Sequence, residues 1–199
     1  MTSHTIKPVI EAAELLYGAF TSRFNREMPR PVITVQTKGR MNACAWFWAD
    51  RWQDGEQSRI PEINLCAEHV SDDLAELANS VLHEMVHYAN WLDGVRDCSS
   101  SQYHNRRFKQ RCEAVGLICE RHPQKRYGWA CTKLSTEEET FVISLGIDET
   151  ALNLSRIAQQ GKHRTGSKLK KWVCGCTNLW AAVDVHATCN RCGRPFRKS

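Results

Sequence analysis

Two histidines and a glutamate in one short stretch are the residues of this sequence best suited to chemistry. They lie in His83-Glu84-Met85-Val86-His87, with the two histidines four positions apart. On a helix, that spacing puts both imidazoles on one face, where both can bind a single metal ion. Glu84 lies about a hundred degrees round the helix from His83. It can therefore act as general base toward a water at the metal, as in the H-E-x-x-H motif of zinc hydrolases.

A catalytic zinc is held by three protein ligands and keeps one open position, so a third ligand is required. His104 is the strongest candidate, because it lies at or near the start of the next predicted helix. A metzincin pattern is excluded, because Asn90 and Asp93 stand where that pattern requires Gly and His. A carboxylate ligand of the gluzincin type would come from Glu113 or Glu120, and neither has the surrounding pattern that His104 has.

A second cluster of metal-binding residue types lies near the end of the sequence. Two cysteine pairs, Cys174/Cys176 and Cys189/Cys192, flank twelve residues with the pattern of a hairpin. Two such pairs, each on a tight turn, can hold a structural zinc tetrahedrally. The first pair is C-x-C in place of the usual C-x-x-C, so His186 is an alternative ligand. A redox-active disulfide is the other interpretation of these pairs.

The two clusters together resemble the SprT-like (Spartan-type) family of zinc metallopeptidases, which often ends in a small zinc ribbon. The shared pattern is H-E-x-x-H, a spacer of sixteen residues, and His104-x-x-x-Phe108. The resemblance covers roughly Pro8 to Gly116 and Trp172 to Phe196. Where the family often has Gly-Pro after the third histidine, this sequence has Asn105-Arg106. The resemblance implies a zincin-like peptidase that is recruited to DNA to degrade proteins stuck on it, such as DNA–protein crosslinks.

The elements that must position these residues can be predicted from hydrophobic periodicity. Apolar residues recur with a helical period from Leu74 to Leu92, Asp73 with Glu76 predicts the N-cap, and Gly94 predicts the end. The other predicted helices are Pro8 to about Glu27, Arg106 to Gly116, Ser135 to Gly146, and Asp148 to Gln159. The predicted strands are Val32–Thr37, Ala43–Trp52 and Ile60–Cys66.

This order of elements predicts an α+β, zincin-like domain over residues 1–159, a basic linker over 160–171 and a zinc β-ribbon over 172–199. A chain of 199 residues suits one medium domain and a small module. The module is too small to bury a sufficient core, so its zinc would stabilise the fold. No stretch is apolar enough to span a membrane, and ten cysteines without a secretory signal indicate a reducing cytoplasm. We hypothesise that it is the cytoplasm of a bacterium or of a bacteriophage host.

Aromatic residues in two places are candidates for contact with substrate. Zincin proteases hold an extended substrate along a sheet edge, and the second predicted strand is the candidate edge, with Trp46 or Trp48 near the cleft. The alternative is that these tryptophans fill the core. A hydroxyl from Tyr127 is a candidate for stabilising a developing oxyanion, and the lone His122 is predicted to lie on the surface.

The charge of the sequence is distributed unevenly. Residues 1–155 have a net charge of −4, whereas residues 156–199 have a net charge of +9. Cations interleaved with aromatics such as Trp172 and Trp180 are typical of single-stranded or junction DNA binding. The candidate contacts are Lys162, Arg164, Lys168, Lys170, Lys171, Arg191, Arg194 and Arg197. The alternatives are a solubilising surface, a nucleic-acid-binding module with a vestigial protease site, and a zinc hydrolase whose substrate is not a peptide.

Overall fold

The computed structural model describes residues 5–37, 43–70, 73–154, 156–157 and 169–199. The chain divides into two compact units, Met1–Ile157 and Ala158–Ser199, and each unit is described here by itself. Among the described residues, no helix has the length and apolar character needed to cross a membrane.

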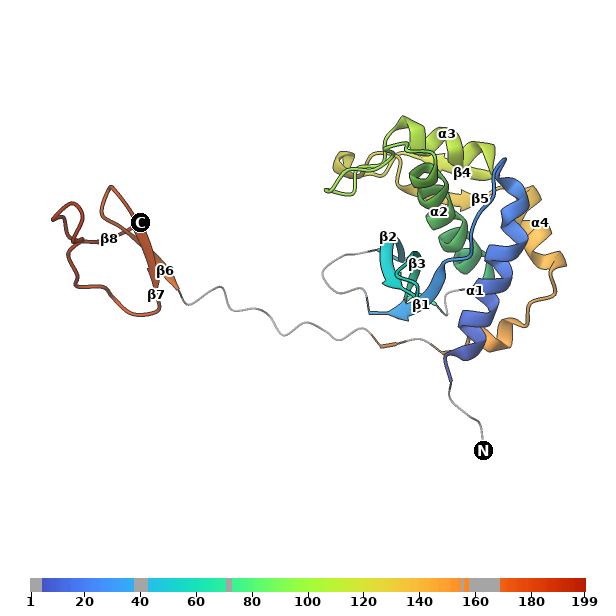
Figure 1. Ribbon diagram of the computed structural model, residues 1–199, viewed down its shortest axis with the longest axis horizontal. Helices are drawn as coiled ribbons and strands as arrows, with labels where there is room; N and C mark the ends of the chain where they lie inside the picture. The colour runs from blue at the N-terminus through green and yellow to red at the C-terminus, as the bar shows by residue number, and fades with distance from the viewer. Residues whose placement is uncertain (1–4, 38–42, 71–72, 155, 158–168) are drawn as a thin grey trace. The chain divides into compact units, whose positions relative to one another are not determined.

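The first unit is organised around α2 (Leu74–Leu92), the helix that carries H-E-x-x-H. This helix lies between a three-stranded sheet and a second layer made of α3, β4 and β5 (Figure 1). Its N-cap is the predicted one, because the Asp73 side chain accepts a hydrogen bond of 2.7 Å from the Glu76 backbone N–H. Gly94 follows its end with a φ of 66°, as predicted for a C-terminal stop.

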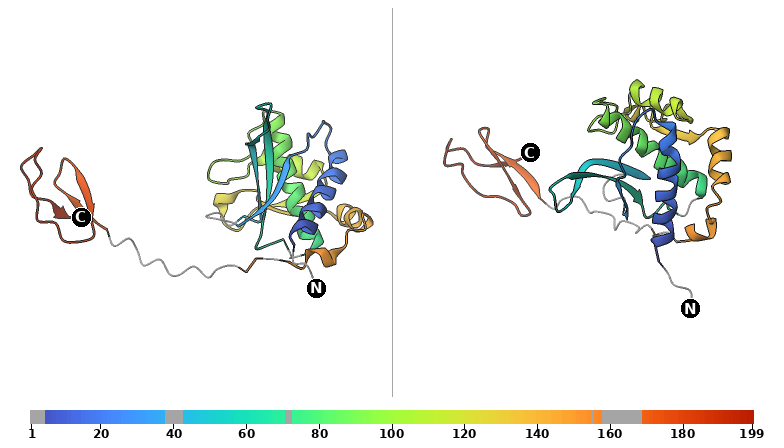
Figure 2. Two further views of the ribbon diagram at one scale, coloured as in Figure 1. Left: turned by 60° about the horizontal axis from the view of Figure 1, so that its bottom comes forward. Right: turned by 45° about the vertical axis from the view of Figure 1, so that its right-hand side comes forward.

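The sheet has the strand order β1-β3-β2, with bounds Val32–Gln36 for β1, Ala45–Gln53 for β2 and Arg59–Cys66 for β3. All three strands were predicted, and their ends differ from the prediction by two residues or fewer. β3 is the central strand, with β1 parallel to it on one side and β2 antiparallel to it on the other. β2 is therefore an edge strand, as predicted. Helices α1 and α2 pack on the sheet, as the views of Figure 2 show. The core between them includes Ile63 and Leu65, which are fully buried.

The first helix is shorter than predicted: α1 spans Lys7–Phe20, and the predicted end at Glu27 is wrong. A 3-10 turn, η1 (Thr21–Arg23), follows it, and Phe24 is already extended. The hydroxyl of Thr21 donates to the Gly18 carbonyl at 2.7 Å, and Ser22 makes a similar bond to Ala19. Such side-chain bonds to the preceding turn compete with the helix pattern, which explains why the apolar stripe continues after the helix has ended.

The layer on the other side of α2 begins with α3 (Arg106–Ala114). The Asn105 side chain caps α3 by accepting from the backbone N–H groups of Arg107 and Phe108, so it serves in place of the Gly-Pro common in the family. Two short strands, β4 (Leu117–Glu120) and β5 (Cys131–Leu134), pair antiparallel and were not predicted. A 3-10 turn, η2 (Lys125–Tyr127), lies between them.

The last part of the first unit contains α4 (Thr136–Ser144), whose N-cap Ser135 accepts from the Glu138 N–H, as predicted. The predicted helix from Asp148 to Gln159 is wrong in its described part. Only the 3-10 turn η3 (Glu149–Leu152) forms there. The backbone N–H of Arg156 instead donates to the carbonyl of Ala67 at 2.8 Å, so the chain leaves the helical path and lies beside the end of β3.

The second unit is a small sheet with the strand order β7-β6-β8. Its strands are β6 (Lys170–Val173), β7 (Asn178–Ala181) and β8 (Arg197–Lys198). Lys170 and Lys171, which were predicted to belong to the linker, are the first residues of β6. The predicted fold class, a mixed α+β domain followed by a small β-ribbon, is confirmed.

Candidate metal centres

The three predicted histidines come together at one point of the first unit. His83 and His87 project from α2, and His104 lies two residues before α3. The Nε2 atom of His104 lies 3.3 Å from Nε2 of His83 and 3.1 Å from Nε2 of His87. Ligand atoms of all three lie within 4.8 Å of one another. The predicted convergence of imidazoles from two helices is therefore what the structure shows.

Each imidazole is oriented by a contact at its other ring nitrogen. The contacts are His83 Nδ1 to Thr132 Oγ1 at 3.0 Å, His87 Nδ1 to Asp97 Oδ2 at 2.9 Å, and His104 Nδ1 to the Gln102 carbonyl at 3.0 Å. A carboxylate and a carbonyl can only accept hydrogen bonds, so Nδ1 of His87 and of His104 carries the proton. Their Nε2 atoms then carry lone pairs directed at the common point, as ligation requires.

This donor set fits a divalent metal ion. Zinc binds imidazole nitrogen at about 2.0–2.1 Å, and a tetrahedral site then separates two such nitrogens by about 3.3 Å. The observed Nε2 separations of 3.1 and 3.3 Å agree with that value. A cation bound by all three Nε2 atoms would account for this close approach of three imidazoles.

The ring of Phe108 lies against all three imidazoles. Its centroid is 4.7 Å from that of His83 and 4.6 Å from those of His87 and His104. Phe108 is fully buried, so it excludes water from that side of the site and restricts the rotation of each imidazole. This packing is a physical reason for an aromatic residue four positions after His104.

The backbone at His104 is held by a loop that arrives from between β4 and β5. The His104 N–H donates to the Tyr127 carbonyl, and the His104 carbonyl accepts from the Trp129 N–H, both at 3.0 Å. Between them, Gly128 has a φ of 65°, and a Cβ on it would lie 2.1 Å from the His104 carbonyl oxygen. Only glycine therefore fits at this position without displacing the backbone of the third ligand.

Burial sets the charge state of two of the ligands. It lowers the pKa of His83 well below 6.5, and the neighbouring imidazoles of His87 and His104 lower it further. Burial likewise lowers the pKa of His104 to about 4. For His87, burial also acts to lower the pKa, but the hydrogen bond that its Nδ1–H donates to Asp97 and the charges of Glu84 and Asp97 raise it above 6.5. His83 and His104 are thus neutral at pH 7, the form that binds metal ions.

Glu84 is 5% exposed and lies beside this cluster. Burial raises the pKa of its carboxyl group to about 7, and the charge of Asp97 acts in the same direction. The charge of His87 and a hydrogen bond from the Phe47 backbone N–H oppose that rise in pKa. A carboxyl group whose pKa lies near neutral pH can both take and return a proton, as a general base and acid must.

The same hydrogen bond brings the edge strand β2 to the site. The pairing of β2 with β3 turns the N–H of Phe47 away from β3, toward the open edge of the sheet. The ring of Phe47 stacks on Tyr88 of α2 with centroids 5.2 Å apart. Trp46 and Trp48 lie on the opposite face of β2, so the prediction that one of them lies beside the cleft is wrong.

Two further predictions concern the loop around η2: contact of the Tyr127 hydroxyl with a developing oxyanion, and a surface position for His122. The Tyr127 ring packs against His122, with centroids 4.8 Å apart, and it is the Tyr127 carbonyl that contacts the site, through the His104 N–H. His122 was predicted to lie on the surface; it is half-buried and lies outside the histidine cluster.

Asp97 is the strongest site residue that the sequence pattern did not reveal. It is 8% exposed, and its Oδ2 contacts both His87 Nδ1 and the Asn90 side-chain amide, the latter at 2.8 Å.

Replacement Asp97→Asn is expected to lower zinc affinity at the histidine site about 10- to 100-fold, because the hydrogen bond that orients His87 is weakened. Competition with a chromophoric chelator measures this affinity. The exposed Asp50→Asn change is the matched control and should leave the affinity unchanged.

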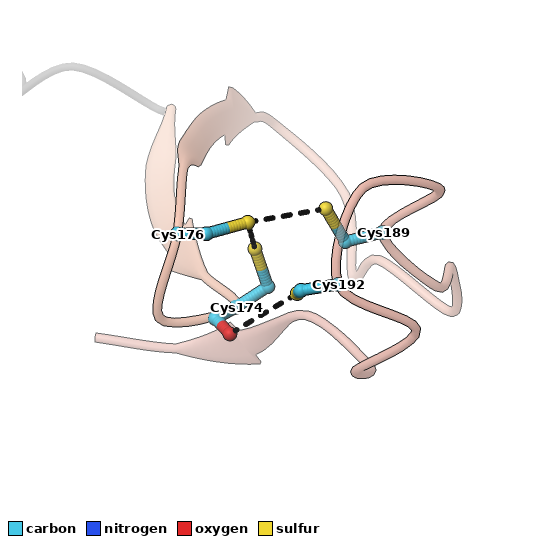
Figure 3. A group of neighbouring side chains, drawn as sticks. All are labelled: Cys174, Cys176, Cys189 and Cys192. Atoms are coloured by element: carbon cyan, nitrogen blue, oxygen red, sulfur yellow. Dashed lines mark hydrogen bonds between the residues drawn. The ribbon is translucent and has the colours of Figure 1, made fainter.

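The four predicted cysteines form the second cluster (Figure 3). The Sγ atoms of Cys174 and Cys176 are 3.5 Å apart, and those of Cys176 and Cys189 are 3.6 Å apart. Tetrahedral zinc with sulfur ligands at about 2.3 Å requires roughly 3.8 Å between sulfurs, whereas a disulfide requires about 2.05 Å. All four are free thiols in a geometry that fits zinc, and His186 is exposed and outside the cluster.

Electrostatics around one of these sulfurs favour ligation. Hydrogen bonds from the backbone N–H groups of Arg191 and Cys192 lower the pKa of Cys189 to about 6. Metal ligation requires the thiolate, so this shift favours the form that binds zinc.

The predicted nucleic-acid contacts fall into two groups. Lys162, Arg164 and Lys168 lie outside the described residues. The others lie on the second unit, where Lys170, Arg191, Arg194 and Arg197 are exposed and Lys171 is half-buried. Trp180 is 60% exposed and lies opposite Lys171 in the β6–β7 pairing, whereas Trp172 is buried.

The fold and the first site together define an α+β protein whose H-E-x-x-H helix and third histidine form a three-histidine metal centre. A family model described as SprT-like family matches residues 13–128, more than half of the chain. The chain therefore belongs to the SprT-like family, as its motifs indicated. No curated protein and no solved structure gives a match.

Proposed function

We propose that this protein is a zinc-dependent endopeptidase that acts on proteins bound to DNA. The observation that carries the peptidase part is the convergence of His83, His87 and His104 beside the buried carboxyl of Glu84, in a member of the SprT-like family. Burying a carboxyl group costs free energy, and a scaffold that only holds a metal through three histidines does not need one beside them. This argues against a vestigial site.

The three histidines would hold the zinc ion through Nε2. Bound there, zinc supplies Lewis-acid chemistry, polarising a peptide carbonyl and making water more acidic. The Glu84 carboxylate takes the proton from the attacking water and then delivers it to the amide nitrogen that leaves. The Phe47 N–H holds that carboxylate in position, while the Phe108 ring excludes competing water from the opposite side.

The edge strand β2 supports a polypeptide substrate. Within the described part of the chain, no strand pairs with the outer edge of β2. An extended peptide can add to such an edge through main-chain hydrogen bonds, which bind it without regard to its sequence. Because the Phe47 N–H already contacts Glu84, a peptide on this edge would lie beside the general base.

The DNA part of the proposal rests on charge. Residues 156–199 have a net charge of +9, and the exposed Trp180 lies next to Lys171 on one face of the ribbon sheet. Cations beside an exposed aromatic side chain are typical of proteins that bind single-stranded nucleic acid. None of the ten cysteines, all of which lie in the described parts of the chain, forms a disulfide, which suits a reducing cytoplasm, bacterial or bacteriophage-infected.

The peptidase proposal is tested by His104→Ala. The purified wild-type chain is expected to hold two zinc ions, and the variant one, because two histidines alone hold zinc too weakly. Hydrolysis of an unfolded protein such as casein should fall to background. Elemental analysis and a peptide-release assay measure the two effects, with His122→Ala as the control that keeps both zinc ions and full activity. Two zinc ions and normal hydrolysis in His104→Ala would show the proposal to be wrong.

The DNA part is tested by cleavage of a DNA-bound protein with and without its DNA. At low salt, DNA is expected to increase cleavage, and neutralising the ribbon cations with Lys170→Gln, Lys171→Gln, Arg191→Gln and Arg194→Gln should remove the increase. Casein hydrolysis without DNA should remain as in the wild type. Equal cleavage with and without DNA would leave a peptidase that is not coupled to DNA.

A further inference from the structure

A pocket of about 350 Å³ lies on the first unit. One face of α3 forms most of its wall, through side chains spaced three or four positions apart, and Trp129 completes it. The lining residues are Arg106, Lys109, Gln110, Glu113 and Trp129. Trp129 is half-buried and packs partly against the core.

Cations surround this indole ring. The Lys109 Nζ and the Arg121 Cζ each lie 4.9 Å from the Trp129 ring centroid, and Lys109 also forms an ion pair with Glu113 of the same helix. Arg106 and Arg121 are exposed, and neither forms an ion pair within the described ranges. Such cations on an aromatic face attract a polyanion that also carries flat, stackable groups.

The charge of the surrounding sequence points the same way. Residues 95–134 contain nine Lys and Arg against three Asp and Glu, a net charge of +6. Residues 1–94 and 135–155 each have a net charge of −5. The first turn of α3 carries Arg106 and Arg107, although a helix N-terminus favours acidic side chains. The local excess of cations is therefore not explained by helix stability.

The pocket is connected to the histidine site through the backbone. The backbone N–H of Trp129 donates to the carbonyl of His104 at 3.0 Å, so the indole belongs to a residue that holds the third ligand in place. Binding of a polyanion on Trp129 would therefore act on a segment that supports the metal site.

We propose that this pocket binds single-stranded nucleic acid, with a base stacked on Trp129 and the flanking phosphates on Arg106 and Arg121. Gln110 and Glu113 then meet the polar edge of the base. The indole favours a nucleic acid over the other polyanion of a cell, an acidic polypeptide, because only a nucleic acid carries bases that stack on an aromatic ring. A role of this pocket in cleavage rests on the peptidase function proposed above, whereas the binding itself does not.

Binding is tested with the full chain carrying Glu84→Gln, which prevents self-digestion, and a fluorescein-labelled oligothymidylate of about 15 nucleotides. Trp129→Leu is expected to weaken binding about tenfold, because the stacking surface is lost. The double variant Arg106→Gln and Arg121→Gln should reduce the slope of log affinity against log salt by about 1.4, roughly 0.7 for each phosphate contact. Anisotropy titrations at several salt concentrations measure both effects.

Arg107→Gln is the matched control, since it removes one exposed charge from the same turn of α3 without changing the pocket lining. It should change the slope by much less than the double variant. The proposal is overturned if Trp129→Leu and the double variant bind as the parent does, or lose no more affinity than Arg107→Gln. Because Trp129 is half-buried, zinc content and melting temperature are used to check that Trp129→Leu folds. If it does not fold, the salt dependence of binding by the double variant at the exposed Arg106 and Arg121 tests the proposal.

Two further readouts separate the alternatives. Photocrosslinking with 5-iodouracil in the oligonucleotide should label a peptide that contains Trp129, and labelling confined to residues 170–199 would contradict the proposal. Oligoglutamate tests the alternative ligand. If it binds with equal affinity and the same variants lose this binding, the pocket binds acidic polypeptides and the proposal is overturned. Casein hydrolysis by the chain with Glu84 intact reports on the proposed function separately, because it requires no nucleic acid.

Discussion

Replacement of Glu84 by Gln is expected to abolish peptide hydrolysis while both zinc ions stay bound. Glutamine has nearly the same shape and keeps an acceptor for the Phe47 N–H, but it cannot take a proton from water. General acid–base catalysis contributes about 10²- to 10⁴-fold, so the rate should fall by at least that much. A peptide-release assay with elemental analysis of the same sample measures the effect.

Glu76→Gln is the matched control, because it makes the same chemical change on an exposed residue of α2. It should keep full activity. The melting temperature of Glu84→Gln should not fall, since the substitution removes a carboxyl group that burial destabilises. Undiminished hydrolysis in Glu84→Gln would remove Glu84 from the mechanism, and loss of zinc would show that it ligates the metal instead.

The second large effect is expected from Cys189→Ser in the ribbon. Structural zinc in such small modules supplies about 10–16 kcal/mol at neutral pH, far more than a sheet of three short strands can supply by packing. The variant should therefore hold one zinc ion in place of two, and amides of β6 and β7 should exchange with solvent freely. Hydrogen exchange read by mass spectrometry measures this unit by unit.

In the same variant, the first unit should keep its protection, its zinc and its hydrolysis of casein, because the histidine site shares no ligand with the cysteine cluster. His186→Ala tests the specificity of the effect, since His186 is exposed and outside the cluster. That variant should hold two zinc ions. If Cys189→Ser keeps two zinc ions, the cluster does not bind zinc through this sulfur.

The sequence was most informative where local rules decide the structure. The N-cap Asp73 and the C-terminal Gly94 determine the ends of α2. The apolar residues that recur with a helical period determine which face of α2 is buried. The spacing of His83 and His87 then follows from helix geometry alone. The ends of α1 were less predictable, because hydroxyl groups of Thr21 and Ser22 compete with the helix pattern in a way that periodicity does not show.

The sequence was least informative where the site depends on segments distant along the chain. Thr132 contacts His83 across 49 positions, and it lies on β5, a strand of four residues with little apolar alternation. Asp97 and Gly128 stand in loops where many Asp and Gly residues occur without a role in a site. What selects them is their approach to His87 and His104, which only the folded chain reveals.

The loop that holds His104 has a consequence for biosynthesis. Tyr127, Gly128 and Trp129 fix the backbone of the third ligand, and Thr132 orients the first, yet all four follow the ligands in the chain. On the ribosome, a growing polypeptide that has already exposed H-E-x-x-H still lacks these contacts. The contacts that hold the histidine site are therefore complete only after the segment up to Thr132 has left the exit tunnel.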